Sequence, residues 1–403
     1  MIQFEQAFKI VMDSCFFMES EQIELSNCLG RVLFCDVYSD INMPPFNKAA
    51  MDGYACREED IFNILEVVEI IPAGTTPKKI IEKNQCSKIM TGAPLPQGAT
   101  AIIIVEDIEE LKNGKVKYFK AASEKNTCNH EEKMTGKPNI CFIGEDIKKG
   151  EKILEKGTLL KPQHIAVLAS VGCVNPEVSK MPKVGVIATG SELVEPDIKP
   201  EMSQIRNSNG IQMCSQLENL NINPNYYGIA PDIEQKTFEI LTQAISENDI
   251  VLISGGVSMG DFDFVPKILK KCELTILFDQ IAIQPGKPTT FALGKNKICF
   301  GLPGNPVSSF LQFELLVKPL IYKMMGATFK QNEFYLPLSS DITRKKADRK
   351  AWIPGNFTNK GIEPINYNGS AHINGFALSD GIFEFPIGVF SFKKGDFVNV
   401  RQL

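Results

Sequence analysis

Hydrophobic residues recur at two different spacings along the chain. Near the N-terminus a helical spacing predicts an amphipathic helix, whose apolar positions are Phe4, Phe8, Val11, Met12 and Cys15. Between residues 182 and 325, short apolar runs such as "KVGVIAT" and "DIVLIS" alternate with helical stretches such as "SNGIQMCSQLENL". Strands that alternate with helices are typical of a doubly wound α/β domain. We therefore predict this fold for residues 182–325.

The segments around this domain have other patterns. Residues 46–140 contain short β-prone runs broken by turns, which indicate an inserted β-rich domain. A helical pattern returns at residues 162–170, so we group residues 1–45 and 141–181 as one split domain. Residues 326–403 combine short alternating runs with glycine turns, which predicts a compact all-β module. The whole pattern indicates an α/β multidomain protein.

Composition narrows the classes of function. The 403-residue chain has a net charge of −5, which argues against a general nucleic-acid or membrane-surface role because these require a basic surface. The 11 cysteines form no CxxC pair and the three histidines share no ligand spacing, so no zinc site is predicted. No apolar run is long enough to span a bilayer, and we find no targeting segment. We expect a cytoplasmic protein that binds any anion at a local site.

Four predicted turns follow strands of the α/β domain. Ligands bind beyond the carboxyl ends of the strands in an open parallel sheet. Such turns expose backbone N–H groups and helix N-termini, which favour anions. Carboxylates in the same turns would repel an anion unless a cation bridges them, so the set predicts a phosphate site bridged by Mg²⁺. The turns span residues 188–193, 230–232, 254–263 and 301–306, and their carboxylates are Glu192, Asp232, Asp261 and Asp263.

Residues 282–309 contain two Pro-Gly corners. Gly286 and Gly304 would allow the backbone to approach a ligand closely, while the flanking prolines stiffen each corner. Asn305 is placed to cap the following helix, and Pro306 suits its first position. Lys287 adds a positive charge. Together these features predict a preorganised oxyanion pocket.

Each signal also has a simpler interpretation. "TGSEL" is explained by an ordinary turn and cap, Asp232 by a helix N-cap, and "LPGNP" by a helix start. The run "SGGVSMGD" is harder to explain in this way, because a turn alone rarely requires two adjacent glycines. As a set at one edge of a sheet, these turns favour a ligand that carries phosphate.

Several long segments resemble those of one known family. In chain order they are "MDGYA" (51–55), "TGAPLPQGATAIIIVED" (91–107), "GEDIKKGE", "GVIATGSELV", "QIRNSNG" (204–210), "SGGVSMGDFDF", "PGKPTTF" and "GLPGNPVSS". They resemble the signature segments of the molybdopterin molybdenumtransferases, which are related to the C-terminal part of gephyrin. The resemblance spans essentially the whole chain.

The resemblance implies an architecture and a reaction. It implies an elongated homodimer whose subunit has a split helical dimerisation domain, a β-rich insertion, an α/β domain of the molybdenum-cofactor-binding type and a C-terminal β-barrel. The reaction takes adenylylated molybdopterin and molybdate, inserts the metal into the dithiolene and releases AMP with the help of Mg²⁺. The dithiolene sulfurs are the soft ligands for molybdenum, so the protein needs no cysteine there. Molybdopterin adenylyltransferase and molybdoenzyme maturation factors are candidate partners.

The resemblance also implies site residues. Asp52 and Thr91 would line the cleft from the partner subunit, and Asp232 and Asp263 would hold Mg²⁺. Glu192 and Lys287 complete the catalytic set. The residues expected to surround the nucleotide and the oxyanion are Thr189, Gly190, Ser191, Gly255, Gly256, Ser258, Gly286, Pro303, Gly304, Asn305, Pro306 and Ser370.

Two positions depart from the family pattern. Gln284 stands where the family usually has a lysine, and Pro354 stands near the place of a common arginine. One lost cation about 4 Å from an anion removes on the order of 4 kcal/mol before desolvation is counted, so molybdate affinity is expected to be weaker or to depend on another group. The candidates to take the place of that arginine are Arg344, Lys345, Lys346 and Arg349. The other functions considered are an adenylyltransferase that makes the nucleotide-bearing substrate and a gephyrin-like scaffold.

Overall fold

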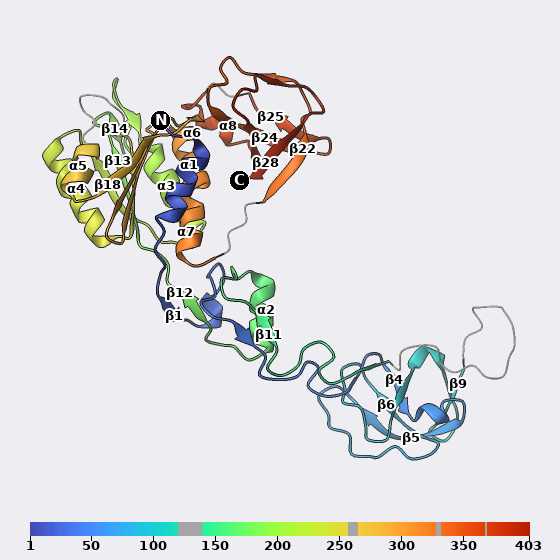
Figure 1. The fold of residues 1–403 in the computed structure, drawn as a ribbon. Coiled ribbons are helices and arrows are strands. Elements are labelled where there is room, and N and C mark those ends of the chain that lie inside the picture. The colour runs from blue at the N-terminus through green and yellow to red at the C-terminus, as the bar shows by residue number, and fades with distance from the viewer. Residues whose placement is uncertain (120–138, 257–264, 328–331, 367–368) are drawn as a thin grey trace. The chain divides into compact units, whose positions relative to one another are not determined.

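The chain divides into two compact units. The computed structural model describes residues 1–119, 139–256, 265–327, 332–366 and 369–403. Unit 1 comprises Met1–Cys35, Lys156–Ile165 and Asn175–Leu403, and unit 2 comprises Asp36–Glu155 and Ala166–Val174. Figure 1 shows that the blue N-terminal helix belongs to the same unit as the orange and red C-terminal segments. None of the described helices is long and apolar enough to cross a membrane.

Unit 1 is built on a six-stranded sheet in the order β16-β13-β17-β21-β20-β18. The first four strands of this order are parallel, and the last two run antiparallel to their neighbours. This sheet confirms the predicted α/β class. The strands are β13 (Val184–Thr189), β16 (Asn225–Ala230), β17 (Ile250–Ser254), β18 (Thr275–Gln280), β20 (Pro288–Gly294) and β21 (Lys297–Leu302).

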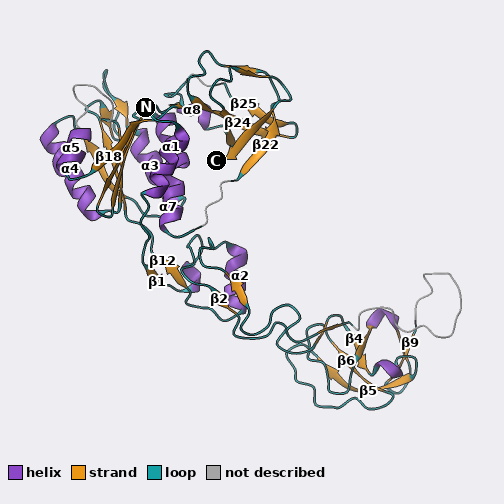
Figure 2. Cartoon of the chain, viewed as in Figure 1, coloured by secondary structure: helices purple, strands orange, loops and turns teal. Residues whose placement is uncertain are grey.

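Helices cover both faces of this sheet, as Figure 2 shows. Alternate residues of a strand point to opposite faces, so Leu252 joins one buried core while Val251 and Ile253 join the other. This explains why the strands read as continuous apolar runs. One face packs against α1 (Phe4–Asp13), α3 (Ser208–Glu218), α6 (Pro306–Gln312), a π-helical turn (Phe313–Val317) and α7 (Lys318–Met324); the other packs against α4 (Glu234–Glu247) and α5 (Val265–Lys271).

The predicted amphipathic helix at the N-terminus is confirmed as α1. Its buried residues Phe4, Ala7 and Val11 share a core with the α/β sheet, whereas the sequence pattern grouped this segment with residues 141–181. The backbone N–H of Ile2 also donates to the carbonyl of Gln280, at 3.1 Å. Apolar spacing predicts a buried face but not its partner, so the packing of α1 on α7 could not be foreseen.

A second sheet in unit 1 follows the order β19-β24-β26-β28-β22, with β25 paired to β24. Its first strand, β19 (Ile283–Gln284), ends just before the first Pro-Gly corner, and Gln284 pairs with Ala351. Closure of this module into a barrel remains a prediction. Its other elements are β22 (Glu333–Pro337), β23 (Ile342–Thr343), β24 (Lys350–Thr358), β25 (Gly361–Pro364), α8 (Ile373–Phe376), β26 (Gly381–Phe385), β27 (Ser391–Phe392) and β28 (Phe397–Gln402).

Unit 2 contains a six-stranded sheet in the order β7-β4-β6-β5-β9-β8. Tyr54 and Ala55 are neighbours in β4, yet they belong to different buried clusters, so this sheet also has an apolar core on each face. The strands of unit 2 are β2 (Val37–Tyr38), β3 (Lys48–Ala49), β4 (Gly53–Cys56), β5 (Ile64–Ile71), β6 (Gln85–Ile89), β7 (Ala101–Ile104), β8 (Ile108–Glu110), β9 (Lys115–Tyr118), β10 (Ile140–Cys141) and β11 (Lys152–Leu154).

Three further short elements are two strands and a helix. β1 (Ser20–Gln22) pairs with β12 (Glu177–Ser179) inside unit 1. α2 (Pro162–Ser170) matches the helical pattern predicted for residues 162–170. The proposed boundaries of four domains remain a prediction, because the contacts divide the chain into two units only.

Candidate functional site

A cavity of about 590 Å³ opens at the carboxyl ends of β13, β17 and β21. All four predicted turns contribute to its wall, which is the edge of the sheet where ligand binding was expected. The predicted residues that line it are Thr189, Gly190, Glu192, Asp232, Gly255, Gly256, Pro303, Gly304, Asn305 and Pro306. Among the other predicted residues, Ser191, Gly286, Lys287 and Ser370 are outside this lining. Ser258, Asp261 and Asp263 are not among the residues that the structure describes.

Glycines allow the turns after β13 and β17 to pass close to each other. Gly255 has a φ of +88°, and a Cβ added there would lie 2.6 Å from the carbonyl oxygen of Thr189. Gly256 also has a positive φ, and a Cβ there would lie 2.8 Å from Thr189 Oγ1. The Thr189 hydroxyl donates to the Ser254 carbonyl at 3.3 Å. The two adjacent glycines are therefore required by the packing of one turn on the other.

Ser191 and Asp232 link the turns after β13 and β16. The backbone N–H of Ser191 donates to Asp232 Oδ2 at 2.8 Å, and the backbone N–H of Asp232 donates to Ser191 Oγ at 3.0 Å. Helix α4 has Ile233 at its N-cap, with no side-chain hydrogen bond. The simpler interpretation of Asp232 as a helix cap is therefore wrong. Its carboxylate lines the cavity and is held in place from a neighbouring turn.

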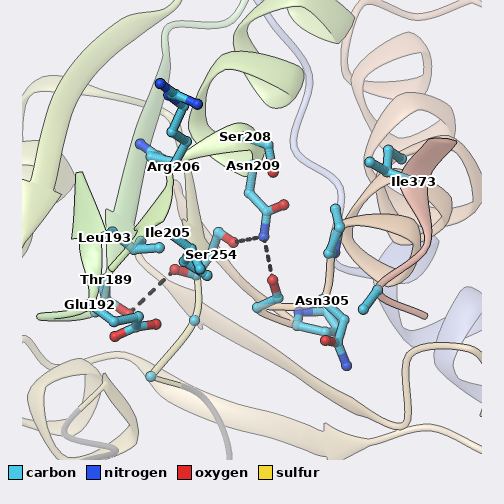
Figure 3. A pocket seen from close by; sticks show the side chains of 18 of the residues that line it. Thr189, Glu192, Leu193, Ile205, Arg206, Ser208, Asn209, Ser254, Asn305 and Ile373 are labelled. Carbon is cyan, nitrogen blue, oxygen red and sulfur yellow. Dashed lines mark hydrogen bonds between the residues drawn. The ribbon is translucent and has the colours of Figure 1, made fainter. Parts of the chain in front are cut away.

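Asn209 is a central residue of the site that the sequence analysis did not select. Its Nδ2 donates to Ser254 Oγ at 2.7 Å and to the Gly304 carbonyl at 2.8 Å (Figure 3). Asn207 fixes the start of α3, because its side chain accepts from the N–H of Gly210 at 3.0 Å. Asn209 thus ties the first turn of α3 to the ends of β17 and β21. The quoted segment "QIRNSNG" contained it, but its partners are far away in the sequence.

Arg206 is the second cavity residue that was not selected. The short strands β14 (Leu193–Val194) and β15 (Ile205–Arg206) pair in parallel, which brings Arg206 to the cavity. Its Nε donates to the Pro196 carbonyl at 2.9 Å. In Figure 3 its guanidinium lies above the Glu192 carboxylate and well apart from it. The cavity lining therefore contains both a positive and a negative side chain.

The two Pro-Gly corners differ in role. The second corner lines the cavity, and Pro306 occupies the first turn of α6 as predicted; Asn305 is at the N-cap but makes no side-chain capping bond. At the first corner, Gly286 has a φ of +109°, and an added Cβ would lie 2.6 Å from Gln312 Nε2. Packing against a protein side chain is therefore sufficient to explain the glycine there. Lys287 is exposed, next to the lining residue Pro288.

Two arginines near this corner have different surroundings. Arg344 donates to three backbone carbonyls, those of Val389, Arg349 and Pro386, at 2.6 to 2.8 Å. The Arg344 guanidinium is therefore held by backbone carbonyls of the C-terminal β module. Arg349 donates through Nη1 to the Ile283 carbonyl at 3.2 Å, directly beside Gln284. Pro354 is buried in β24, opposite Ile382.

In unit 2, Asp52 and Thr91 form a pair of their own. Asp52 Oδ1 accepts from the Thr91 hydroxyl and from the Thr91 backbone N–H, each at 2.6 Å. The hydroxyl first, and then the backbone N–H, hold the pKa of Asp52 below its usual value, because both bonds favour the ionised form. This pair joins the signature segment "MDGYA" to the segment that begins "TGAP".

Comparison with known proteins gives this arrangement a family. Residues 2–172 match the family model described as "MoeA N-terminal region (domain I and II)", and residues 185–323 match "Probable molybdopterin binding domain". A molybdopterin molybdenumtransferase of Staphylococcus epidermidis is 34% identical over 410 residues, which cover 99% of this chain and 95% of the relative. The chain belongs to the molybdopterin molybdenumtransferase family. A relative of the same name from Staphylococcus aureus is 32% identical, with the same coverage of 99% and 95%.

Solved structures support the same family membership. A molybdopterin biosynthesis moeA protein from Pyrococcus horikoshii OT3 matches with a TM-score of 0.84 and 32% identity, over 100% of both chains. A second structure of a moeA protein from Pyrococcus matches with a TM-score of 0.79 and 31% identity, over 100% of this chain and 98% of the other. The resemblance drawn from the signature segments is thus confirmed over the full length. Members of the molybdenumtransferase family share this multidomain α/β architecture.

Proposed function

We propose that this chain is a transferase of molybdenum cofactor biosynthesis that inserts molybdenum into molybdopterin. The observation that carries the proposal is the meeting of all four strand-end turns in one cavity, in a chain that matches named molybdenumtransferases over its full length. Amide-rich turns with nearby helix starts suit the phosphate groups of an adenylylated substrate. Molybdate is the second substrate, and AMP is the product released.

Asp232 and Asp263 are the proposed ligands of Mg²⁺. Among the described residues, no group of three or more His, Cys, Asp or Glu side chains could hold a metal ion. Mg²⁺ bound together with substrate phosphates needs only one or two carboxylates, so Asp232 in the cavity wall fits this requirement. Glu192 adds a second carboxylate to the same wall. When bound, Mg²⁺ would neutralise charge on the phosphates.

Lys287 and Ser370 are the proposed contacts of molybdate. Each stands next to a residue that lines the cavity, Lys287 before Pro288 and Ser370 before Ala371. Arg349 lies against the strand that carries Gln284, so we propose it as the cation that takes the place of the family's missing arginine. Cations and N–H or O–H donors suit a tetrahedral dianion, and the reaction then depends on positioning and electrostatic stabilisation.

The active protein is proposed to be a cytoplasmic homodimer. In this proposal, Asp52 and Thr91 of one subunit complete the cavity of the other. The lowered pKa of Asp52 supports the proposal of a fixed negative charge there at neutral pH.

A single-turnover experiment tests the function. Purified protein is mixed with adenylylated molybdopterin, Mg²⁺ and molybdate, and AMP is measured over time. Asp232→Asn preserves an acceptor for the Ser191 N–H but removes the charge, so we expect AMP release to slow by roughly 10²-fold or more. Asp263→Asn is expected to act in the same direction.

Glu239→Gln is the matched control, because this carboxylate is exposed on α4 and does not line the cavity. It should release AMP at the wild-type rate. AMP release that is independent of molybdate would contradict the proposal. Formation of pyrophosphate from ATP would instead indicate an adenylyltransferase.

A further inference from the structure

The orientation of the Asn209 side-chain amide is fixed by its partners. Asn209 is only 7% exposed, and its Nδ2 lies 2.8 Å from the carbonyl oxygen of Gly304. A backbone carbonyl can only accept a hydrogen bond, so the amide nitrogen must face Gly304. The second bond of Nδ2, to Ser254 Oγ, holds the amide plane from another strand. The amide oxygen therefore cannot exchange places with the nitrogen.

This geometry leaves the Asn209 amide oxygen without a donor. Oδ1 is buried, and no group in the described part of the chain donates to it. Figure 3 shows it turned away from the two hydrogen bonds of Nδ2, toward the side of the cavity where Ile373 lies. A buried acceptor without a partner is costly and is usually satisfied by a ligand or water. Asn209 is part of the cavity wall, so its amide lies beside the space that a bound molecule would occupy.

The surroundings of this oxygen select the chemistry of its partner. The wall contributed by the second Pro-Gly corner and by the start of α8 with the residues just before it is largely apolar, with Pro303, Pro306, Ala371 and Ile373. Such a wall suits a flat ring. A phosphate oxygen is an acceptor and would be repelled by another acceptor, whereas the N–H of a neutral amine can donate to it. The group that faces Asn209 should therefore belong to a heterocycle.

We propose that Asn209 Oδ1 accepts a hydrogen bond from the exocyclic amine of the substrate's fused nitrogen heterocycle. Asn209 then determines specificity for an amino-bearing ring, while its Nδ2 holds the ends of β17 and β21 in register around that ring. The inference rests on the proposed function, because the substrate there contains two such rings, adenine and pterin. Both present the same donor, and separate probes distinguish them.

The test is a thermodynamic cycle in ligand binding. Calorimetry measures the dissociation constants of two probe pairs with the full-length protein. One pair is AMP and purine ribonucleoside 5′-monophosphate, which lacks the amine; the other is pterin and its analogue without the amine. For the ring that faces Asn209, wild-type protein should bind the amine-bearing probe roughly tenfold more tightly. Asn209→Ala should abolish this preference.

A further variant separates this role from a structural one. Gln216→Ala removes another buried amide of α3, whose Nε2 donates to Glu314 and which does not line the cavity, so it should retain the preference. A purely structural Asn209 would weaken both members of each pair equally.

The outcomes distinguish this inference from the proposed function. Wild-type protein that binds both pairs without preferring the amine would overturn the inference alone. An Asn209→Ala variant that keeps the full wild-type preference would also overturn it. Wild-type protein that binds none of the four probes would count against the proposed function and remove the inference with it.

Discussion

At the scale of single residues, Asp52 shows how two short hydrogen bonds lower the pKa of a carboxyl group. Both bonds come from Thr91 and reach the same oxygen, at 2.6 Å each. They stabilise the ionised form, so the pKa of Asp52 is lowered although the carboxyl group is exposed. Because the folded-state pKa is depressed, the contribution of this pair to stability is present above the ordinary pKa of aspartate. It is lost as the pH falls through the lowered value.

Thr91→Val tests the cause of this shift. Valine removes the hydroxyl but keeps the shape and the backbone N–H, so we expect the pKa of Asp52 to rise toward its ordinary value while staying below it. Carboxyl-carbon NMR of the full chain measures the titration directly. Thr100→Val, whose hydroxyl accepts from the backbone N–H of Glu58, is the control and should leave the pKa of Asp52 unchanged. An unchanged titration in Thr91→Val would show that the hydroxyl is not the main cause.

Residue types were easier to predict than their partners. Asp232 was expected near the phosphates from its place at a strand end, and it does line the cavity. Its bond to Ser191 joins positions 41 residues apart, and such pairs cannot be found from local spacing. Asn209 was missed for the same reason, since its partners Ser254 and Gly304 lie in two other turns.

At the scale of elements, the turns after β13 and β17 depend on each other. Gly255 contacts the carbonyl of Thr189 so closely that a side chain there would meet backbone atoms. Gly304 also lines the cavity, but an added Cβ would have its nearest neighbour at 3.8 Å. Gly255 and Gly304 therefore allow a controlled comparison, because both line the cavity but only Gly255 is sterically crowded.

Gly255→Ala should destabilise unit 1 strongly. The positive φ and the clash with backbone together cost about 2–4 kcal/mol. Gly304→Ala should cost less than about 1 kcal/mol, because its new methyl group makes only ordinary contact. Chemical denaturation followed by fluorescence of Trp352, which is buried in the core of unit 1, measures both. Equal losses of stability in the two variants would refute the steric explanation.

Periodicity predicted most elements of the α/β part but not their assembly. The helix over residues 162–170 was placed at its observed bounds. The burial of alternate strand residues in two separate cores made these runs easy to recognise as strands. The helix predicted to start after Asn305 is followed directly by a π-helical turn, which hydrophobic spacing does not report. The pairing of β19 with β24 also could not be predicted from the sequence pattern, since parallel partners are set by tertiary contacts.

At the scale of the whole molecule, the proposed dimer makes a quantitative prediction. Asp52→Asn and Asp232→Asn subunits would each form inactive homodimers. In a mixed dimer, one site would combine an intact Asp52 with an intact Asp232. Random pairing of equal amounts should then restore about a quarter of the wild-type AMP release.

The mixing experiment needs subunits that exchange, so the two variants are unfolded and refolded together. Each variant refolded alone is the control, and it should stay inactive. If the mixture is no more active than the two controls, both residues must serve the same subunit's site or none. Size-exclusion chromatography verifies that the refolded protein is dimeric.

Family membership was the property most readily predicted at this scale. The signature segments extend along nearly the whole chain, and the relatives cover it to the same extent. The division into two units was less accessible, because the N-terminal helix resembles any amphipathic helix until its core partners are known. The predicted boundaries between four domains remain a prediction, because the contacts define only two units.

The discontinuity of unit 1 has a consequence for biosynthesis. Unit 2 draws on no residue beyond Val174, so all its chain is available early in translation. In contrast, the apolar face of α1, within the first 35 residues, cannot be buried until the ribosome has synthesised α7, which ends at Met324. Domains generally fold as units during synthesis. The middle of the polypeptide should thus mature first, while its leading end stays exposed to chaperones and proteases until the sheet of unit 1 is complete.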